Sequence, residues 1–305
     1  MRKEKKLPLE DLKIFGIYKD GKYTIPEEQV KALKDGRMTD IVELRNLKGK
    51  NIEIESLPAR LSIVRGDNGN PTLRIDPVYR EPNAHPQLSQ EERQRLIKAD
   101  IANIRKSFVD KDGNVQTEII EYDKETKQFM SFDPRKVKAP ETVNEQQLTP
   151  NQKRKYKEGE VVELADGSAF QFTGIDKKGM RSNRSGLVLS VILDGGISYL
   201  LYTGLKRMLG KKSKEEKSYS QGYIDGINKV QKQIERRIPH NPADRDAFRD
   251  LNNVKQELSK VSAAHPKEFQ NRDYDDVKRL NSIDTEEGKN PDKNRDKDEG
   301  RQRRF

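Results

Sequence analysis

The sequence predicts an α+β protein made of repeated small helix-plus-antiparallel-meander modules, which an apolar segment, a helical hairpin and a disordered tail follow. One observation is a sequence pattern that recurs three times. It begins with an apolar residue, a Ser, Thr or Pro and a Gln or Glu at the start of a basic helical run, and short strands of alternating polarity follow. It starts at Ile25, Leu88 and Leu148, about 60 residues apart, which indicates repeated supersecondary units. The other observation is composition. With 31% hydrophobic and 37% charged residues, the chain should form several small cores instead of a large one.

Residues 1–83 are expected to form the N-terminal α+β module. The stretch Leu7–Gly16 has apolar residues on one side and ends at a glycine, which indicates a short helix, and KDGK then turns the chain. A second helix is predicted over Pro26–Lys34. Four alternating segments, with a turn at Gly66–Asn70, predict an antiparallel meander. These segments are VELRNL, NIEIESL, ARLSIV and TLRIDPV.

Residues 84–135 are expected to form the second helix-plus-strands repeat. Ser89 and Glu92 have the spacing of a capping box, in which each side chain bonds the free backbone amide of the other, so a helix should start there and run to Ala99. Three strands should follow, over Ile104–Val109, Val115–Tyr122 and Gln128–Phe132.

A Pro-containing linker, residues 136–147, should separate this repeat from the third. The third repeat, residues 148–175, has the same order of a basic helix and short strands in LTPNQKRKYKEGEVVELADGSAFQF. We therefore expect three similar units in the first half of the chain.

Several of these segments carry a resemblance to known families. FGIYKDGKYT, TDIVELRNLKG, ARLSIV and LRIDPVYREP, together with the third repeat, resemble the tandem domain-of-unknown-function families 4099 and 3945 over residues 7–175. Those modules recur on conjugative and mobilisable elements of gut anaerobic bacteria, where DNA topoisomerases are common neighbours. The resemblance implies a genetic setting and supplies no catalytic residue. From Lys177 onward the chain departs from the pattern of these families.

The long apolar run, residues 186–209, is compatible with three structures. Polar residues recur at every fourth position from Ser190 to Tyr202, which suits a packed helix with one polar stripe. The length of Leu187–Leu205 suits a membrane span, but a central Asp costs about 2.5 to 3.5 kcal/mol there. A turn at Asp194–Gly195 would instead make a β-hairpin. The polar centre favours a cytoplasmic packed helix or hairpin over a segment associated with the inner membrane.

Residues 219–262 predict an antiparallel hairpin of two amphipathic helices. Apolar residues from Tyr223 to Ile238 share one face of the first helix, and Pro239 ends it. Asn241 is the expected N-cap of the second helix. The apolar face of that helix comprises Phe248, Leu251, Val254, Leu258 and Val261. Residues 281–305 have almost no apolar side chains and should be disordered.

The net charge of +10 is unevenly distributed, since residues 1–175 carry +2 and residues 176–210 carry +4. The basic residues on either side of the apolar run are therefore candidates for contact with an anionic partner, either a nucleic acid or a lipid headgroup. They are Lys177, Lys178, Arg181, Arg184, Lys206, Arg207, Lys211 and Lys212.

Motifs for catalysis, cofactors or metals are weak. The absence of Cys excludes disulfides and thiolate sites and suits a reducing cytoplasm. His85, His240 and His265 have no second ligand at metal-binding spacing. Gly204–Ser213 resembles a phosphate loop with the wrong glycine spacing. We therefore predict no catalytic or cofactor-binding residue.

A calcium loop is the strongest metal motif, in the segment DKDGNVQTEIIE. Its candidate ligands are Asp110, Asp112, Asn114 and Glu121. Val115 stands where such a loop needs glycine, and the flanking residues read as strands, so a β-turn over Lys111–Asn114 is favoured.

Together these features predict a non-enzymatic accessory or scaffold protein of a bacterial mobile genetic element, which binds protein or DNA partners of transfer or DNA processing. The expected partner is a protein, such as a mobile-element DNA topoisomerase or a transfer protein. One alternative is a basic nucleic-acid-binding protein, which the low charge of residues 1–175 disfavours. The other is a membrane-anchored accessory protein that uses residues 186–209.

Overall fold

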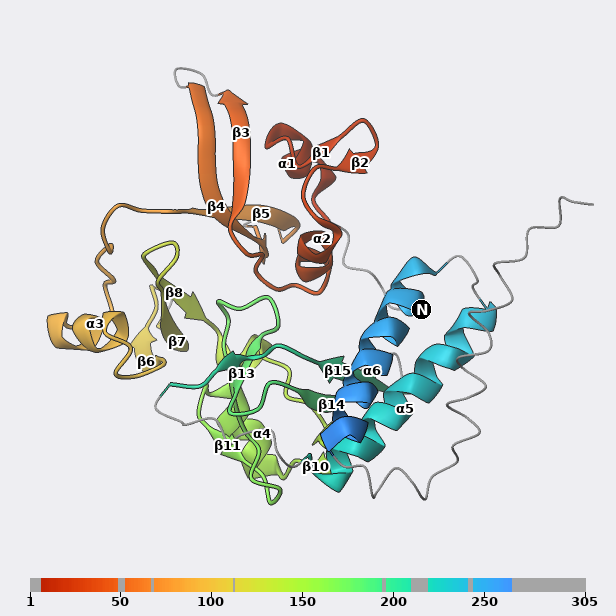
Figure 1. Ribbon diagram of the computed structural model, residues 1–305. Helices are drawn as coiled ribbons and strands as arrows, with labels where there is room; N and C mark the ends of the chain where they lie inside the picture. The colour runs from red at the N-terminus through yellow and green to blue at the C-terminus, as the bar shows by residue number, and fades with distance from the viewer. Residues whose placement is uncertain are drawn as a thin grey trace, which may run out of the picture. The chain divides into compact units, whose positions relative to one another are not determined.

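The computed structural model shows helices together with mainly antiparallel sheets, in which β13 and β16 form a parallel pair, and this confirms the α+β class (Figure 1). It describes residues 7–48, 53–66, 69–111, 113–193, 196–209, 219–240 and 244–264. The predicted disordered tail, residues 281–305, lies outside this part of the chain. Two compact units divide between Lys255 and Gln256, inside the last helix, so every sheet belongs to the first unit.

The N-terminal module contains two short helices, a two-stranded hairpin and a three-stranded sheet. The helices are α1, Leu9–Ile14, and α2, Glu27–Lys34, and the hairpin consists of β1, Tyr18–Lys19, and β2, Lys22–Tyr23. The sheet has the order β3-β4-β5, with bounds Val42–Lys48, Glu53–Arg65 and Pro71–Pro77. Its buried core comprises Leu12, Ile17, Leu33, Val42, Leu44, Ala59, Leu61 and Leu73.

Two of the four predicted strands of the meander are one long strand, β4. NIEIESL and ARLSIV were predicted as separate strands, but Pro58 between them lies inside β4 and pairs with Glu43 of β3. Strand β5 pairs with β4 only from Ala59 onward. Pro58 therefore has no paired residue on the β5 side of β4, so its lack of a backbone N–H removes no hydrogen bond between these two strands. Its carbonyl accepts the Val78 amide, at 2.9 Å.

The second module has the predicted elements, α3, β6, β7 and β8, with bounds Gln90–Ile97, Ile104–Val109, Val115–Asp123 and Gln128–Phe132. The capping box is confirmed, because Ser89 and Glu92 bond each other's backbone amides. The strands form an antiparallel sheet in the order β6-β7-β8. One face of this sheet packs Ile120 against Leu88 and Leu96 from the helical segment.

The predicted linker, residues 136–147, is wrong as a structural prediction. A short 3-10 helix, η1, spans Pro134–Lys136, and two strands follow, β9, Thr142–Val143, and β10, Gln146–Gln147. Val143 is completely buried, and β9 pairs with β14. Strand β10 lies at the edge of its sheet, which suits its polar composition, while Val137 and Val143 fix the segment to the core.

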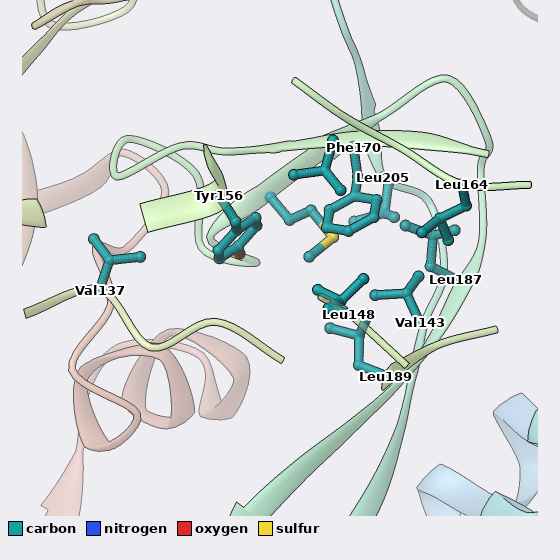
Figure 2. Packing of buried hydrophobic residues seen from close by; sticks show 11 residues of the cluster. Val137, Val143, Leu148, Tyr156, Leu164, Phe170, Leu187, Leu189 and Leu205 are labelled. Carbon is teal, nitrogen blue, oxygen red and sulfur yellow. The ribbon is translucent and has the colours of Figure 1, made fainter. Parts of the chain in front are cut away.

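A shared core joins this segment to the third repeat (Figure 2). Helix α4, Pro150–Lys157, precedes a sheet in the order β11-β12-β13-β16. The strands span Val162–Glu163, Ala169–Phe172, Met180–Ser182 and Lys206–Arg207. The core comprises Val137, Val143, Leu148, Tyr156, Val162, Leu164, Phe170, Met180, Leu187, Leu189 and Leu205. It therefore draws on residues well beyond 148–175.

The apolar run is a β-hairpin and not a helix, which corrects the packed helix and the membrane helix considered above. Strands β14, Leu187–Leu193, and β15, Gly196–Tyr202, are paired in register throughout. Leu187 and Leu189 enter the core, while Val188 on the other face lies against Gly226, where an added Cβ would come within 2.9 Å. The strand reads as uniformly apolar because both of its faces are covered. No helix among the described residues is long and apolar enough to cross a membrane.

Helix α5, Gln221–Arg237, is followed by the 3-10 helix η2, Ile238–His240, and by α6, Arg245–Ala264. The predicted apolar face of α5 is buried, including Tyr223, Ile227, Val230 and Ile234. The predicted cap Asn241 lies outside the described residues, and Asp244 accepts a bond from the Ala247 amide at 2.9 Å. Phe248, expected on the apolar face of α6, is 44% exposed. The pairing of the two helices stays a prediction.

Candidate functional site

The candidate site is a junction at which the first module, the second module and the region 137–209 meet. It is built on β7, where alternate residues point to one face of the sheet. Ile119, Glu121 and Asp123 occupy that face, opposite the face that carries Ile120, and all three are buried. We call these residues and their contacts the module junction.

Arg60 of β4 joins the first module to the second. Its side chain is 1% exposed, and its Nε donates to Oδ2 of Asp123 at 2.5 Å. Nη1 donates to the carbonyl of Thr39 at 2.7 Å, and Nη2 pairs with Glu125. The Thr126 hydroxyl also donates to Asp123, at 3.0 Å. The buried charges are thus paired and hydrogen-bonded, which offsets much of the cost of removing them from water.

Main-chain contacts reinforce the same connection. The amide of Tyr79 donates to the carbonyl of Thr126 at 2.9 Å. Gln128 donates from Nε2 to the carbonyl of Pro77 at 2.7 Å. The end of the first module is therefore fixed to the turn between β7 and β8.

Glu121 joins the second module to the region after β12. Its carboxyl accepts the Thr173 hydroxyl at 2.6 Å and the Gly174 amide at 3.1 Å, and Nη2 of Arg181 lies 3.7 Å away. Burial raises the pKa of Glu121 to about 7, although Arg181 and the two hydrogen bonds act in the opposite direction. The charge state of this carboxyl can therefore change near neutral pH.

A small apolar cluster completes the junction. It contains one buried residue from each part: Met38 of the first module, Met130 of the second and Ile175 of the region beyond β12. Phe132 packs against this cluster. A Cβ on Gly174 would lie 2.1 Å from the Phe132 ring, so this close approach requires glycine.

Four of the basic candidates are engaged inside the chain. Lys177 Nζ lies 2.7 Å from Asp40, and Lys206 lies 3.3 Å from Asp176. Lys178 donates to the carbonyls of Thr203 and Gly204, and Arg181 faces Glu121. The hydrogen bond to Asp40 raises the pKa of Lys177, whereas burial lowers the pKa of Lys178.

The other four basic candidates are Arg184, Arg207, Lys211 and Lys212. Arg207 is exposed on β16, and the main-chain amide of Arg184 donates to Ser182 Oγ at 3.0 Å. Lys211 and Lys212 lie outside the described residues. Lys177, Lys178, Arg181 and Lys206 therefore contribute to the internal contacts of the chain, while contact of the eight candidates with an anionic partner stays a prediction.

The calcium-loop candidates are separated by the strand. Asp110 accepts the Asn114 amide at 2.8 Å and the Gln116 side chain at 2.7 Å, which closes the turn between β6 and β7. Glu121 lies six residues along β7 from Val115, which is about 20 Å of extended chain. Its carboxyl belongs to the module junction. Asp112 lies outside the described residues, within which no group of three His, Cys, Asp or Glu side chains could hold a metal ion.

The other weak motifs are dispersed. His85 contacts the hydroxyl of Ser131 at 3.1 Å, and His240 ends η2. His265 lies outside the described residues, as do the last residues of the phosphate-loop-like stretch, 210–213. The described residues of that stretch include β16.

Sequence reasoning missed Arg60 and Asp123. Arg60 lies between the core residues Ala59 and Leu61. This alternation of apolar and polar residues is also typical of a strand that has one face in the core and the other in water. A face that contacts another module has the same alternation as a face in water, so no local signal marks it.

Comparison with known proteins gives a match for the first module. Residues 3–87 match the family model described as protein of unknown function (DUF4099). No curated protein and no solved structure matches the chain. The expected resemblance of later residues to family 3945 stays a prediction. The N-terminal module, which contributes Arg60 to the junction, is therefore similar to the DUF4099 family.

Proposed function

We propose that the chain is a non-enzymatic accessory or scaffold protein of a bacterial mobile genetic element, and that it binds a protein partner of DNA transfer or processing. The observation that carries this proposal is the module junction. Buried pairs such as Arg60 with Asp123 fix small modules to one another through side chains from distant parts of the sequence. Such construction suits a protein that presents several surfaces in a fixed arrangement.

Internal charge pairing favours a protein partner over DNA. Affinity for DNA depends on cations that replace the counterions of the phosphates. Lys177 and Lys206, which looked available in the sequence, instead face Asp40 and Asp176. Their charge is largely compensated before any partner arrives.

Two hairpin ends supply apolar contact surface for a protein. Ile192 lies opposite Ile197 in the β14–β15 pair, and they are 63% and 62% exposed. Val109 lies opposite Val115 in the β6–β7 pair, and both are also exposed. Exposed clusters of large apolar side chains are typical of contact sites. A DNA topoisomerase or a transfer protein of the same element is the partner that the family resemblance suggests.

Two binding measurements test the proposal. Calorimetry with the purified topoisomerase and transfer proteins of the host element should show saturable binding to one of them. The double variant Ile192→Asp with Ile197→Asp should weaken that binding if the β14–β15 end is the contact surface. The double variant Val109→Asp with Val115→Asp tests the β6–β7 end in the same way. If neither pair changes the affinity, the hairpin ends are not the contact surface.

Fluorescence anisotropy with a short DNA duplex and a short single strand tests the nucleic-acid alternative. We expect no binding whose logarithmic affinity falls steeply with salt. Tight, salt-sensitive binding that Arg207→Ala weakens would overturn the preference for a protein partner.

A further inference from the structure

The contact between β7 and the segment Thr173–Arg181 depends on one buried carboxyl, that of Glu121. The segment surrounds this group from the side opposite β7 with the Thr173 hydroxyl and the Gly174 amide, at 2.6 and 3.1 Å. Gly174 is simultaneously pressed against the ring of Phe132. A change in the charge of Glu121 therefore acts directly on the contact between β7 and the segment Thr173–Arg181.

The charged groups around Glu121 leave its ionised form poorly compensated. Arg181 approaches only to 3.7 Å, and Asp176 lies close enough to oppose ionisation. Lys206 neutralises Asp176 in part, at 3.3 Å. On β7 itself, Asp123 shares the face of Glu121 and is engaged by Arg60. Among the described residues the cation paired with Glu121 is thus Arg181, whose nitrogen at 3.7 Å is beyond hydrogen-bond distance.

We propose that this contact is a proton-operated latch, which is closed while Glu121 carries a proton and loosens when Glu121 ionises. A protonated Glu121 can donate to the Thr173 hydroxyl, because a hydroxyl both donates and accepts. An ionised Glu121 still accepts the Thr173 hydroxyl and the Gly174 amide. It is nevertheless a buried charge whose nearest guanidinium nitrogen is 3.7 Å away, so it must draw in water or Arg181. Water that enters would separate Gly174 from Phe132.

The second connection of the junction should not respond in the same way. Asp123 has the guanidinium of Arg60 at 2.5 Å and also accepts from Thr126. The first and second modules should therefore stay joined while the latch loosens. Proton release would therefore act on the contact of β7 with the segment Thr173–Arg181 and leave the pair of Arg60 with Asp123 in place.

A single tryptophan can report on the latch, because the chain contains no Trp. Phe172 lies next to Thr173, and its ring centroid is 6.1 Å from that of Phe132. In the Phe172→Trp variant, the emission should shift to longer wavelength as the pH rises, with a midpoint near 7. Adding Glu121→Gln should abolish the transition. His85→Gln is the matched control for another titrating side chain and should leave it unchanged.

A second variant keeps the test decisive if Glu121→Gln does not fold, which circular dichroism would reveal. Arg181→Met removes the nearby cation, so in the same Trp reporter the midpoint should move to higher pH. A transition that persists in folded Glu121→Gln would overturn the latch. So would a reporter without a transition near neutral pH, or a midpoint that Arg181→Met leaves in place.

Discussion

At the scale of the residue, the module junction depends on two carboxyl groups of β7 with different surroundings. Asp123 has a buried guanidinium at 2.5 Å, whereas the nearest guanidinium nitrogen to Glu121 is at 3.7 Å. The same strand therefore carries one strongly compensated charge and one weakly compensated charge. Loss of the cation beside Asp123 should therefore destabilise the fold, whereas Glu121 should make stability depend on pH.

Loss of Arg60 should be strongly destabilising. Arg60→Met should lower the free energy of unfolding by about 3 to 5 kcal/mol, because Asp123 would stay buried without its cation. Urea denaturation of the full chain measures the change. Arg45→Met is the control, since Arg45 pairs with Glu43 on the exposed side of β3 and should cause no measurable change. Equal losses in the two variants would contradict the assigned role of Arg60.

Glu121 should make stability fall as the pH rises toward neutrality. Its folded pKa of about 7 is above the ordinary value of 4.5, so the folded chain binds a proton that the unfolded chain releases. The contribution is fully present below pH 4.5 and is lost as the pH rises through about 7. Its full size is about 3 kcal/mol. Urea denaturation at a series of pH values should show that the free energy of unfolding declines with pH in the wild-type chain and declines less in Glu121→Gln. Parallel declines in the two proteins would contradict the role of Glu121.

At the scale of the element, local signals predicted structure well where the partners are close in sequence. The box of Ser89 and Glu92 places the start of α3 because both bonds form within four residues. The division of β4 into two strands was wrong, because whether Pro58 can lie inside a strand depends on where the neighbouring β5 ends, which is a long-range property. The supposed linker is similar, because Val137 and Val143 are buried but are six residues apart with polar neighbours, which leaves no periodic pattern.

The β14–β15 hairpin was difficult to predict for a related reason. Leu187 and Val188 point to opposite faces, and both faces are covered, so alternation is lost. The same run then matches a buried helix, a membrane span and a strand equally well. The turn chemistry at Asp194–Gly195 was the signal that favoured a hairpin.

Two substitutions on β14 distinguish a hairpin from an embedded helix. Leu189 is 4% exposed in the core and Ile192 is 63% exposed. Leu189→Asp should lower the free energy of unfolding by about 3 kcal/mol or more, because it buries an unpaired charge. Ile192→Asp should change it by less than about 0.5 kcal/mol. Denaturation of detergent-free protein measures both, and similar large losses would instead indicate that the tip is buried.

At the scale of the whole molecule, the candidate site was the least predictable feature. Spacing offered Glu121 as a calcium ligand beside Asp110, although a β-turn was favoured, whereas the fold turns its carboxyl toward Thr173, 52 residues away. The partner of Asp123 is 63 residues away. Contacts of this kind depend on which faces of different modules meet, and no pattern within one module contains that information.

The first module offers a test of how far its stability depends on the junction. Its core, which includes Leu12, Leu33 and Leu73, lies within the matched residues 3–87, so we expect the isolated segment 1–87 to fold. In that segment Arg60 has no Asp123 and faces water. Arg60→Met should therefore change its free energy of unfolding by less than about 1 kcal/mol, against about 3 to 5 kcal/mol in the full chain. Urea denaturation of the four proteins gives both differences. An equally large loss in the isolated segment would show that Arg60 stabilises the first module itself, through Thr39, and does not act mainly as the connection between modules.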